Sequence, residues 1–473
     1  MNPSASHKLR SVTLDRSSRV ALHDQIYERI RLAITDRRLS PGERLPSTRS
    51  LASQLGIARG TVDAAYARLT GEGYLLARGP AGTIVSPMLH LSPGHGRGAR
   101  VKTPVQKEKP ASQPLPFQMG LPALDLFPRM LWARLAARAA RRLMGAGLAY
   151  PDPAGLPALR EAITSYLAVS RGVVCQPAQI MITGGYQAAI GFLARLLLRS
   201  GDAVWFEEPG YFLARQALEA ASVRLIPVPV DEDGLCVGIA QTQAPDALLA
   251  VVTPAHQSPS GVALSLPRRQ ALLAWAASSG AWIVEDDYDS EFHYVGRKLP
   301  ALKSLDTADR VIYAGSFSKT LFPGLRLGYL VMPMSLVGQT VASLRIVRHG
   351  EAVLGQSIAA DFMAEGHFAR HLKRMPGLYA ARRKALVGAL LDTFGTRVRL
   401  APQPGGMHVL VQFPEGGDDA RMVRRVLAQG FAPAALSAHY IGRERQQGLL
   451  LSFTNILETQ AAEKSQALLR AIG

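Results

Sequence analysis

Residues 316–328 read Ser-Phe-Ser-Lys-Thr-Leu-Phe-Pro-Gly-Leu-Arg-Leu-Gly, and this stretch decides how most of the chain is interpreted. Lys319 stands among hydroxyl side chains and is followed by the cation of Arg326. A lysine in such surroundings can form a Schiff base with pyridoxal 5′-phosphate, whose phosphate Ser316, Ser318 and Arg326 would bind. A lone Ser-x-Lys is more often part of a surface loop, so the prediction depends on the segments around it.

An acidic run, Val-Glu-Asp-Asp-Tyr-Asp at residues 284–289, follows an apolar, strand-like segment. Ligand groups in α/β folds lie at the carboxyl ends of strands. We expect Asp286 to keep the pyridine nitrogen of the cofactor protonated and Tyr288 to hydrogen-bond to its ring hydroxyl. When an acidic run stands alone, it is more often a solvated loop.

Further candidate residues follow other strand-like runs. Gly185 and Tyr186 lie in a Thr-Gly-Gly-Tyr-Gln sequence, where backbone N–H groups at the start of a helix would hold phosphate. Tyr211 follows Glu-Glu-Pro-Gly and either stacks on the pyridine ring or is a core tyrosine. In the loop 253–261, His256 is interpreted as structural rather than catalytic.

Short apolar runs alternate with helical patterns, such as residues 267–279, through this part of the chain. The strand-like runs are Ile180–Thr183, Ala203–Phe206, Leu248–Thr253, Trp282–Glu285 and Val311–Ala314. This alternation predicts an α/β domain with a mostly parallel sheet.

In this order and spacing, the segments resemble fold-type I pyridoxal-phosphate enzymes of the aspartate aminotransferase class, from about Phe117 to the C-terminus. The resemblance implies a large, parallel-rich sheet domain and a small C-terminal subdomain. It also implies a homodimer. In that family, the tyrosine at the position of Tyr150, within Tyr-Pro-Asp-Pro-Ala-Gly-Leu, reaches the phosphate of the neighbouring subunit.

Two positions depart from that family's pattern. The arginine that grips the substrate α-carboxylate falls where this chain has Leu450, and the asparagine of Asn-Pro-x-Gly is here Ser258. An aliphatic side chain cannot bind a carboxylate as a guanidinium does. Ordinary transamination is therefore less expected, and an effector without an amino-acid carboxylate, such as pyridoxal phosphate itself, is more expected.

The first part of the chain predicts a second, smaller domain of the α+β class. A helix with an apolar stripe over Asp24–Ile34 is followed by two short helices joined by a turn at Gly56. The last of these, over Ala58–Leu69, leaves polar side chains outward, as a helix that enters the major groove of DNA does. Residues 74–85 predict two strands around a glycine turn, which would form a wing. A small helical domain with a solvated charged face would give a similar pattern.

Residues 22–85 resemble the winged helix-turn-helix of the GntR family, most clearly in PGERLPSTRSLASQLGIARGTVDAAYARLTGEGYL. The resemblance implies binding to double-stranded operator DNA. The residues implied to contact it are Arg49, Arg59 and Thr61, then Gly82 on the wing, with Arg44 and Arg78 as weaker candidates. Together with a fold-type I body, this head makes the whole chain resemble the MocR/GabR regulators, whose bodies form a head-to-tail dimer.

The charge distribution agrees with a DNA-binding N-terminal part. The chain has 54 Lys and Arg against 36 Asp and Glu, a formal charge of +18. Residues 1–86 carry 13 basic and 7 acidic groups, and residues 87–115 carry 5 and 1. Because residues 87–115 are also rich in Pro, Gly and Ser, we predict a DNA-binding domain over 1–86, a flexible basic linker over 87–115 and an aminotransferase-like domain over 116–473.

Composition also argues against several classes of protein. No apolar run approaches the ~18 residues of a membrane span and the N-terminus lacks the apolar region of a signal peptide, so we expect a cytoplasmic protein without a membrane partner. Cys175 and Cys236 are the only cysteines and form no ligand-spaced cluster with histidine. We therefore expect neither a metal site nor a disulfide.

The combined motifs favour one function over two others. We expect a transcription regulator whose aminotransferase-like domain has little or no turnover and senses pyridoxal phosphate or an amine- or amino-acid-related effector. One alternative is a pyridoxal-phosphate-dependent aminotransferase with a DNA-binding appendage. The other is a DNA-binding protein with an inactive cofactor fold, against which the set of Lys319, Asp286 and Arg326 argues.

Overall fold

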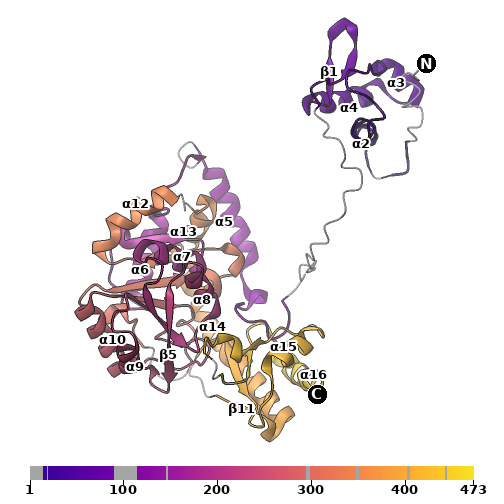
Figure 1. Ribbon diagram of the computed structural model, residues 1–473. Helices are drawn as coiled ribbons and strands as arrows, with labels where there is room; N and C mark the ends of the chain where they lie inside the picture. Colours follow the sequence, from indigo (N-terminus) through magenta and orange to yellow (C-terminus); the bar gives the residue numbers. More distant parts are fainter. Residues whose placement is uncertain are drawn as a thin grey trace. The chain divides into compact units, whose positions relative to one another are not determined.

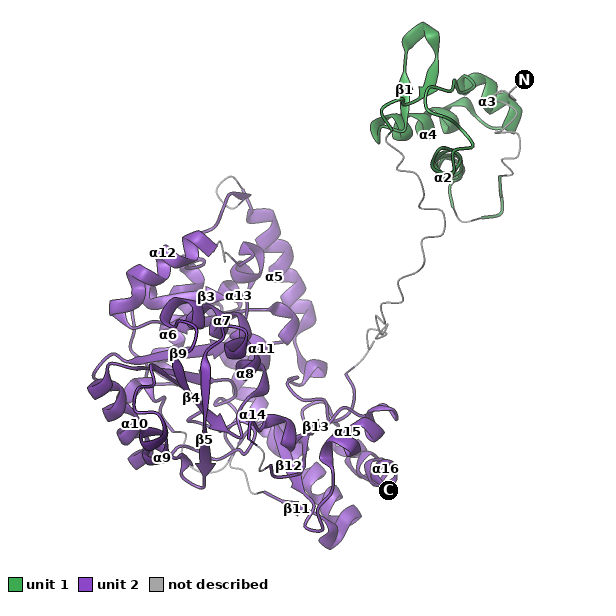
Figure 2. Ribbon diagram, in the orientation of Figure 1, with its two compact units in different colours: residues 1–108 green, residues 109–473 purple. Residues whose placement is uncertain are grey.

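A computed structural model describes residues 14–18, 20–89, 114–144, 148–294, 299–347, 351–401, 405–442 and 445–473. The chain divides into two compact units, residues 1–108 and 109–473 (Figures 1 and 2). Most of the predicted linker, residues 90–113, lies outside the described residues, and the predicted domain limits stay predictions. Among the helices that are described, none combines the length and the apolar character needed to cross a membrane.

Unit 1 contains a helical core and a hairpin. Its elements are α2 (Leu22–Thr35), α3 (Thr48–Leu55), α4 (Arg59–Gly71), β1 (Leu75–Ala77) and β2 (Thr83–Val85), with β1 and β2 antiparallel. Ser47 caps α3, because its side chain accepts a hydrogen bond from the Ser50 N–H at 3.1 Å. Gly56, at φ 60°, ends α3 in the left-handed conformation. The predicted turn and wing are confirmed.

One hydrophobic core holds unit 1 together. The apolar stripe of α2, which includes Ile26, Ile30 and Ile34, packs against Val62 and Leu69 of α4. This packing leaves the start of α4 exposed, as the period of its apolar residues predicts.

Unit 2 is built on a mixed sheet with strands in the order β3-β10-β9-β8-β7-β4-β5-β6. The strands are β3 (Ile180–Thr183), β4 (Ala203–Glu208), β5 (Arg224–Asp231), β6 (Gly234–Leu235), β7 (Leu249–Val252), β8 (Trp282–Asp287), β9 (Val311–Ser316) and β10 (Gly328–Val331). The block from β9 to β5 is parallel, which confirms the predicted mostly parallel sheet. β10 runs antiparallel to both β3 and β9 because the short connection from β9 has no room for a crossover helix.

Helices cover both faces of this sheet (Figure 1). They are α5 (Arg129–Arg142), α6 (Pro157–Ser170), α7 (Tyr186–Leu197), α8 (Phe212–Glu219), α9 (Val237–Gln243), α10 (Leu266–Ser279), α11 (Phe317–Thr320), α12 (Val337–Val347) and α13 (Val353–Ala364). Side chains alternate along each strand: Val284 of β8 packs in the cluster of α7 and α8, while Ile283 packs in that of α9 and α10. This alternation decides which acid of the 284–289 run reaches which face.

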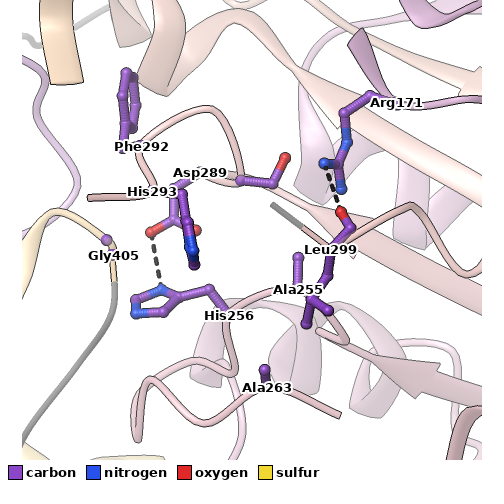
Figure 3. A pocket seen from close by; sticks show the side chains of 11 residues that line it. Arg171, Ala255, His256, Ala263, Asp289, Phe292, His293, Leu299 and Gly405 are labelled. Carbon is purple, nitrogen blue, oxygen red and sulfur yellow. Dashed lines mark hydrogen bonds and ion pairs between the residues drawn. The ribbon is translucent and has the colours of Figure 1, made fainter. Parts of the chain in front are cut away.

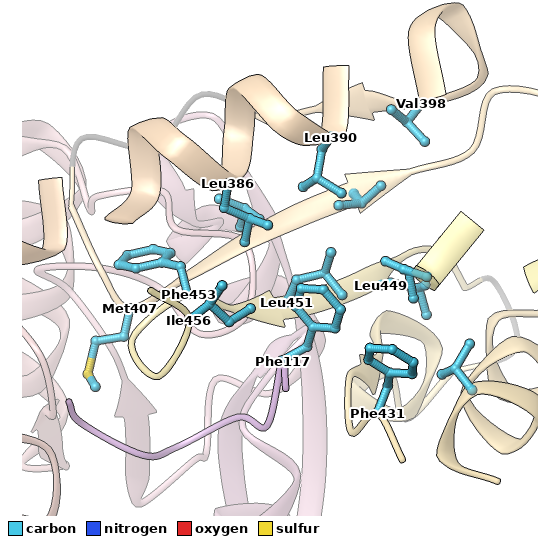
Figure 4. Close-up of a cluster of buried hydrophobic side chains, with 14 of the residues drawn as sticks. Phe117, Leu386, Leu390, Val398, Met407, Phe431, Leu449, Leu451, Phe453 and Ile456 are labelled. Atoms are coloured by element: carbon cyan, nitrogen blue, oxygen red, sulfur yellow. The ribbon is translucent and has the colours of Figure 1, made fainter. Parts of the chain in front are cut away.

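A C-terminal subdomain of unit 2 has its own sheet and core. Its elements are α14 (His367–Phe394), β11 (Arg399–Leu400), β12 (His408–Gln412), α15 (Asp419–Leu427), β13 (Ala434–Ala435), β14 (Leu449–Ser452) and α16 (Ala461–Ile472). The strands lie in the order β11-β12-β14-β13, all antiparallel. Leu386 and Leu390 of α14 pack over Leu449 and Leu451 of β14 (Figure 4). The predicted architecture of a large sheet domain and a small C-terminal subdomain is confirmed.

Candidate cofactor site and DNA-binding surface

Lys319 lies on α11, directly after the carboxyl end of β9. Ser316 caps this short helix, and its Oγ accepts a hydrogen bond from the Ser318 N–H at 3.1 Å. The Lys319 Nζ donates to the carbonyl of Gly120 at 2.8 Å. Burial lowers the pKa of Lys319, against the opposing effect of Asp286 and Asp289. A lowered pKa makes it easier for a lysine to lose its proton and form the neutral amine, which is the form that attacks a carbonyl carbon.

The acids of the 284–289 run have different partners. Glu285 accepts hydrogen bonds from the backbone N–H groups of residues 302–303, at 2.7 and 2.8 Å. Asp287, on the same face of β8, forms a buried ion pair with Arg171 at 2.6 Å. Asp286 points to the opposite face, toward α7. The two partnered acids are thereby excluded as ligands for a bound ring.

Asp286 is buried, and no basic side chain of the described residues forms an ion pair with it. Burial raises the pKa of this carboxyl well above its usual range, while the neighbouring Tyr186 hydroxyl opposes the shift. A buried carboxylate without a counter-cation is costly and would be stabilised by a bound cation. Asp286 therefore fits the protonated nitrogen of a pyridine ring.

Two aromatic side chains and an arginine lie next to this carboxyl. The rings of Tyr186 and Tyr211 are 6.1 Å apart. Burial and, to a smaller extent, Asp286 raise the pKa of Tyr211 to about 12, while Arg326 opposes the shift. Asp286 and Arg326 both act on the Tyr211 phenol. The loop after β4, which carries Tyr211, and the loop after α11, which carries Arg326, therefore lie close to the end of β8. The structure thus brings Tyr211, Tyr186, Arg326 and Asp286 together.

The turn before α7 forms a cradle that accepts an anionic group. Gly185 caps α7 at φ 96°, and a Cβ built on it would lie 3.9 Å from the Arg326 Cζ. A Cβ on Gly184 would lie 2.8 Å from the Glu351 Oε1, so a carboxylate of this chain already rests against the turn. Sequence reasoning missed Glu351, since nothing local indicates this long-range contact. Helix N-termini bind anions through their free N–H groups, so a phosphate fits here.

Taken together, these residues fit pyridoxal 5′-phosphate. The Lys319 amine would meet the carbonyl, Asp286 the ring nitrogen, and the α7 turn with Arg326 the phosphate. When bound, this group supplies an electrophilic carbonyl and an electron-withdrawing ring. In the described part of the chain, no cluster of His, Cys, Asp and Glu is arranged to hold a metal ion.

Glu207 is a further residue that sequence reasoning missed. Its carboxylate accepts hydrogen bonds from the Thr253 N–H at 3.1 Å, the Thr253 hydroxyl at 2.6 Å and the Gln257 amide at 3.0 Å. Gln257 also donates to the carbonyl of Pro209 at 2.7 Å. These bonds tie the loop that carries Tyr211 to the loop that carries His256. The only local signal was an acid at the end of a strand.

His256, Tyr288 and Ser258 lie together at the site, whereas Tyr150 does not. His256 is buried beside Tyr288 and Asp289, at the edge of a cavity of about 30 Å³ (Figure 3). Ser258 lies near the Tyr288 hydroxyl and lowers its pKa, which places it at the site despite its departure from the family's asparagine. Tyr150 is 89% exposed and lies outside the buried group of this chain.

Leu450 lies on the face of β14 opposite to α14. It is fully buried and packs with Leu410, Leu436 and Tyr440. Met119, next to the Gly120 that bonds Lys319, is packed against the same cluster. The surface that Leu450 contributes is therefore apolar.

The predicted DNA contacts lie on exposed parts of unit 1. Arg59, at the start of α4, is exposed and forms an ion pair with Asp63 one turn later, at 3.4 Å. Thr61 is partly exposed on the same turn, and Arg49 is exposed on α3. On the wing, a Cβ built on Gly82 would lie 2.9 Å from the Arg44 Nε, so glycine lets Arg44 lie against the hairpin. Arg78 is exposed beside β1.

We predict that Glu207→Gln changes the pH dependence of stability. Burial raises the pKa of Glu207 to about 7, so the folded state favours the protonated carboxyl. The corresponding stability is fully present below about pH 4.5 and is lost as the pH rises through about 7. Thermal unfolding without added cofactor should show the variant gaining on the wild type between pH 5 and pH 8, by up to about 3 kcal/mol. The exposed control Glu458→Gln should follow the wild type, and a difference for Glu207→Gln that does not vary with pH would contradict the assignment.

Comparisons with known proteins agree with both halves of this description. Residues 127–437 match the family model "Aminotransferase class I and II", and residues 22–85 match "Bacterial regulatory proteins, gntR family". The chain is 37% identical to the probable rhizopine catabolism regulatory protein MocR of Rhizobium meliloti over 94% of this chain and 92% of that protein. It is 34% identical to the pyridoxine biosynthesis transcriptional regulator PdxR of Corynebacterium glutamicum, over 93% and 94%.

Among solved structures, the kynurenine aminotransferase of Pyrococcus horikoshii in complex with PMP is similar, with a TM-score of 0.69 and 28% identity. The match covers 76% of this chain and 91% of that one, so it leaves out a share of this chain about the size of unit 1. The regulators, in contrast, match over nearly the whole chain, head and body together. The chain therefore belongs to the MocR-type regulators of the GntR family, in which a winged helix-turn-helix is joined to an aminotransferase class I and II domain.

Proposed function

We propose that this chain is a DNA-binding transcription regulator that binds pyridoxal 5′-phosphate at Lys319 and responds there to the cofactor itself or to an amine- or amino-acid-related effector. The observation that carries this proposal is the presence, in one chain, of a winged helix-turn-helix with an exposed Arg59 and of a site where the charge of a buried Asp286 acts on the Lys319 amine. As a regulator of transcription, it would act in the cytoplasm.

Each unit would contribute a separate binding step. In unit 1, the start of α4 would enter the major groove, where the Arg59 guanidinium can contact a base edge or phosphate, while the wing with Arg44 and Arg78 would lie near the minor groove. In unit 2, the Lys319 amine would hold the cofactor covalently. Asp286 would keep a proton on the ring nitrogen, and Tyr211 would stack on the ring.

The second binding partner we propose is another copy of the chain. Large apolar side chains are exposed on unit 2: Met130 of α5 by 85% and Ile346 of α12 by 84%, together with Tyr150 after α5. Both helices lie in the upper part of unit 2 in Figure 1. Exposed apolar side chains mark an interface where they form a contiguous patch. A head-to-tail homodimer would cover them and bring Tyr150 to the phosphate of the partner.

One observation favours an alternative function, that of an aminotransferase with a DNA-binding appendage. The complete set of Lys319, Asp286 and Arg326 is what an aminotransferase needs, so the chain could turn over amino acids and carry a DNA-binding appendage. Leu450 argues against this alternative, because the apolar cluster around Leu450 offers no cation to a substrate α-carboxylate. We therefore rank the regulator first.

Operator binding tests the main proposal. In a gel mobility-shift titration at moderate salt, we expect the protein to bind the DNA upstream of its own gene. The affinity should change when pyridoxal phosphate is added. Arg59→Ala should weaken this binding by about 1–3 kcal/mol, as expected for loss of a base contact. The control Arg38→Ala, an exposed arginine outside the predicted surface, should bind like the wild type. Equal retardation of an unrelated fragment would contradict the proposal.

Lys319→Ala tests the division of labour between the units. After incubation with pyridoxal phosphate, the wild type and the exposed control Lys384→Ala should show a visible absorption band that Lys319→Ala lacks. The variant should keep its thermal unfolding midpoint and measurable operator affinity. Loss of folding would refute this division, and sustained turnover of an amino acid with a keto acid by the wild type would instead favour the aminotransferase.

The oligomeric state can be measured by light scattering. The wild-type chain should have the mass of a dimer, and Met130→Glu should shift it toward the monomer because a carboxylate would be buried in the interface. A monomeric wild type at micromolar concentration would rule out the proposed assembly.

A further inference from the structure

His256 is a buried residue of the cofactor site that the proposed function does not use. It lies in the loop between β7 and α10, and its Nδ1 is 3.1 Å from the Asp289 Oδ2 and 3.1 Å from the Tyr288 hydroxyl oxygen. Figure 3 shows the contact with Asp289. The other ring nitrogen, Nε2, is buried and has no hydrogen-bond partner among the described residues.

These contacts fix the position of the ring proton. An ionised Asp289 carboxylate only accepts hydrogen bonds, so an Nδ1 lone pair facing it at 3.1 Å would be repelled. A proton on Nε2 would also leave a buried donor without a partner, which is costly. Both effects favour the form with the proton on Nδ1. His256 therefore donates to Asp289 through Nδ1.

Packing holds the imidazole in this orientation. Gly406 lies against the ring at φ 88°, and a Cβ there would be 2.1 Å from the His256 Cε1. His408 of β12 is a ring neighbour, with centroids 6.0 Å apart, and its Nε2 bonds the carbonyl of Pro259 at 3.0 Å. Burial lowers the pKa of His408 to about 4, so this neighbour is neutral at physiological pH.

The consequence falls on Tyr288. Its hydroxyl cannot donate to an Nδ1 that already carries a proton, and can only accept from it. The titratable groups that face this hydroxyl are His256, Asp289 and Asp286, and Ser258 is a further neighbour. Burial, with the charges of Asp289 and Asp286, raises the pKa of Tyr288 well above its usual range, so the phenol keeps its proton and directs it away from the imidazole. The Asp289 carboxylate, which receives the Nδ1 proton, is the acceptor that competes with the cofactor for the proton of the phenol.

We propose that His256 and Asp289 are a positioning pair that orients the Tyr288 hydroxyl as a hydrogen-bond donor toward the ring hydroxyl of bound pyridoxal phosphate. The inference rests on the proposed function, since it assigns a role to these residues only when the cofactor is held at Lys319. Neither His256 nor Asp289 needs to touch the cofactor. Both act through Tyr288.

Absorbance spectra of the cofactor-loaded full chain test this directly. A hydrogen-bond donor to the ring oxygen stabilises the negative charge of that oxygen. It therefore lowers the pH midpoint at which the bound cofactor loses its proton and the visible absorbance changes. Tyr288→Phe should raise this midpoint, and His256→Leu should raise it by roughly 0.5 to 1 pH unit, the effect of one hydrogen bond. His256→Asn, whose amide nitrogen can occupy the position of Nδ1, should restore a midpoint close to that of the wild type.

The double variant separates positioning from general damage to the fold. In the Tyr288→Phe background, His256→Leu should add no further shift, because the hydroxyl that it orients is gone. An equal shift in both backgrounds, or an unshifted single variant, would overturn the inference while leaving the proposed function standing. A wild type without any visible band would overturn both.

A second measurement does not depend on the cofactor or on the folding of the leucine variant. In nitrogen NMR spectra of the chain labelled at histidine, the signals that disappear in His256→Asn belong to this ring. They should show the proton on Nδ1. A proton on Nε2 alone would overturn the inference.

Discussion

Asp286 and Lys319 come from the ends of neighbouring strands, in surroundings that favour the uncharged form of each. Burial raises the pKa of the carboxyl and lowers that of the amine, and the charge of Asp286 opposes the shift of the amine. Two such groups cost folding free energy if nothing binds them. The parallel register of β8 and β9, which pairs Asp286 with Ala314, keeps them at the same edge of the sheet. The fit to a cationic ring and an electrophilic carbonyl follows from this arrangement.

Other residues of unit 2 hold the loops around Asp286 and Lys319 in place and neutralise the neighbouring acid of β8. Arg171 neutralises Asp287 on the far face of β8, and Glu207 joins the two loops that carry Tyr211 and His256. A bound cofactor can influence DNA binding only if it binds two arrangements of the protein with different affinities. In a dimer, groups such as Tyr150 would let one subunit respond to the occupant of the other.

Much of this was predictable, because the decisive signals are local. Lys319, Arg326 and the glycines before α7 stand in short motifs, and the strands that carry them have simple apolar runs. The cap at Ser47 and the buried stripe of α2 likewise follow from neighbouring residues. The position of β10, antiparallel between β3 and β9, was not predicted, because the pattern of apolar residues in a strand does not show its direction or its neighbours. Glu207 and Glu351 were missed because their partners lie far along the chain. The choice of Asp286 over Asp287 gained a physical reason only from the structure, in which strand alternation places Asp287 against Arg171.

The central claim is that Lys319 is the lysine to which the cofactor binds. Reduction of the chain with borohydride after incubation with pyridoxal phosphate makes the bond permanent, and peptide mass mapping then locates it. The account predicts one phosphopyridoxyl group per chain, on the peptide that contains Lys319. Labelling of other lysines with Lys319 unmodified, or no stable label, would contradict it.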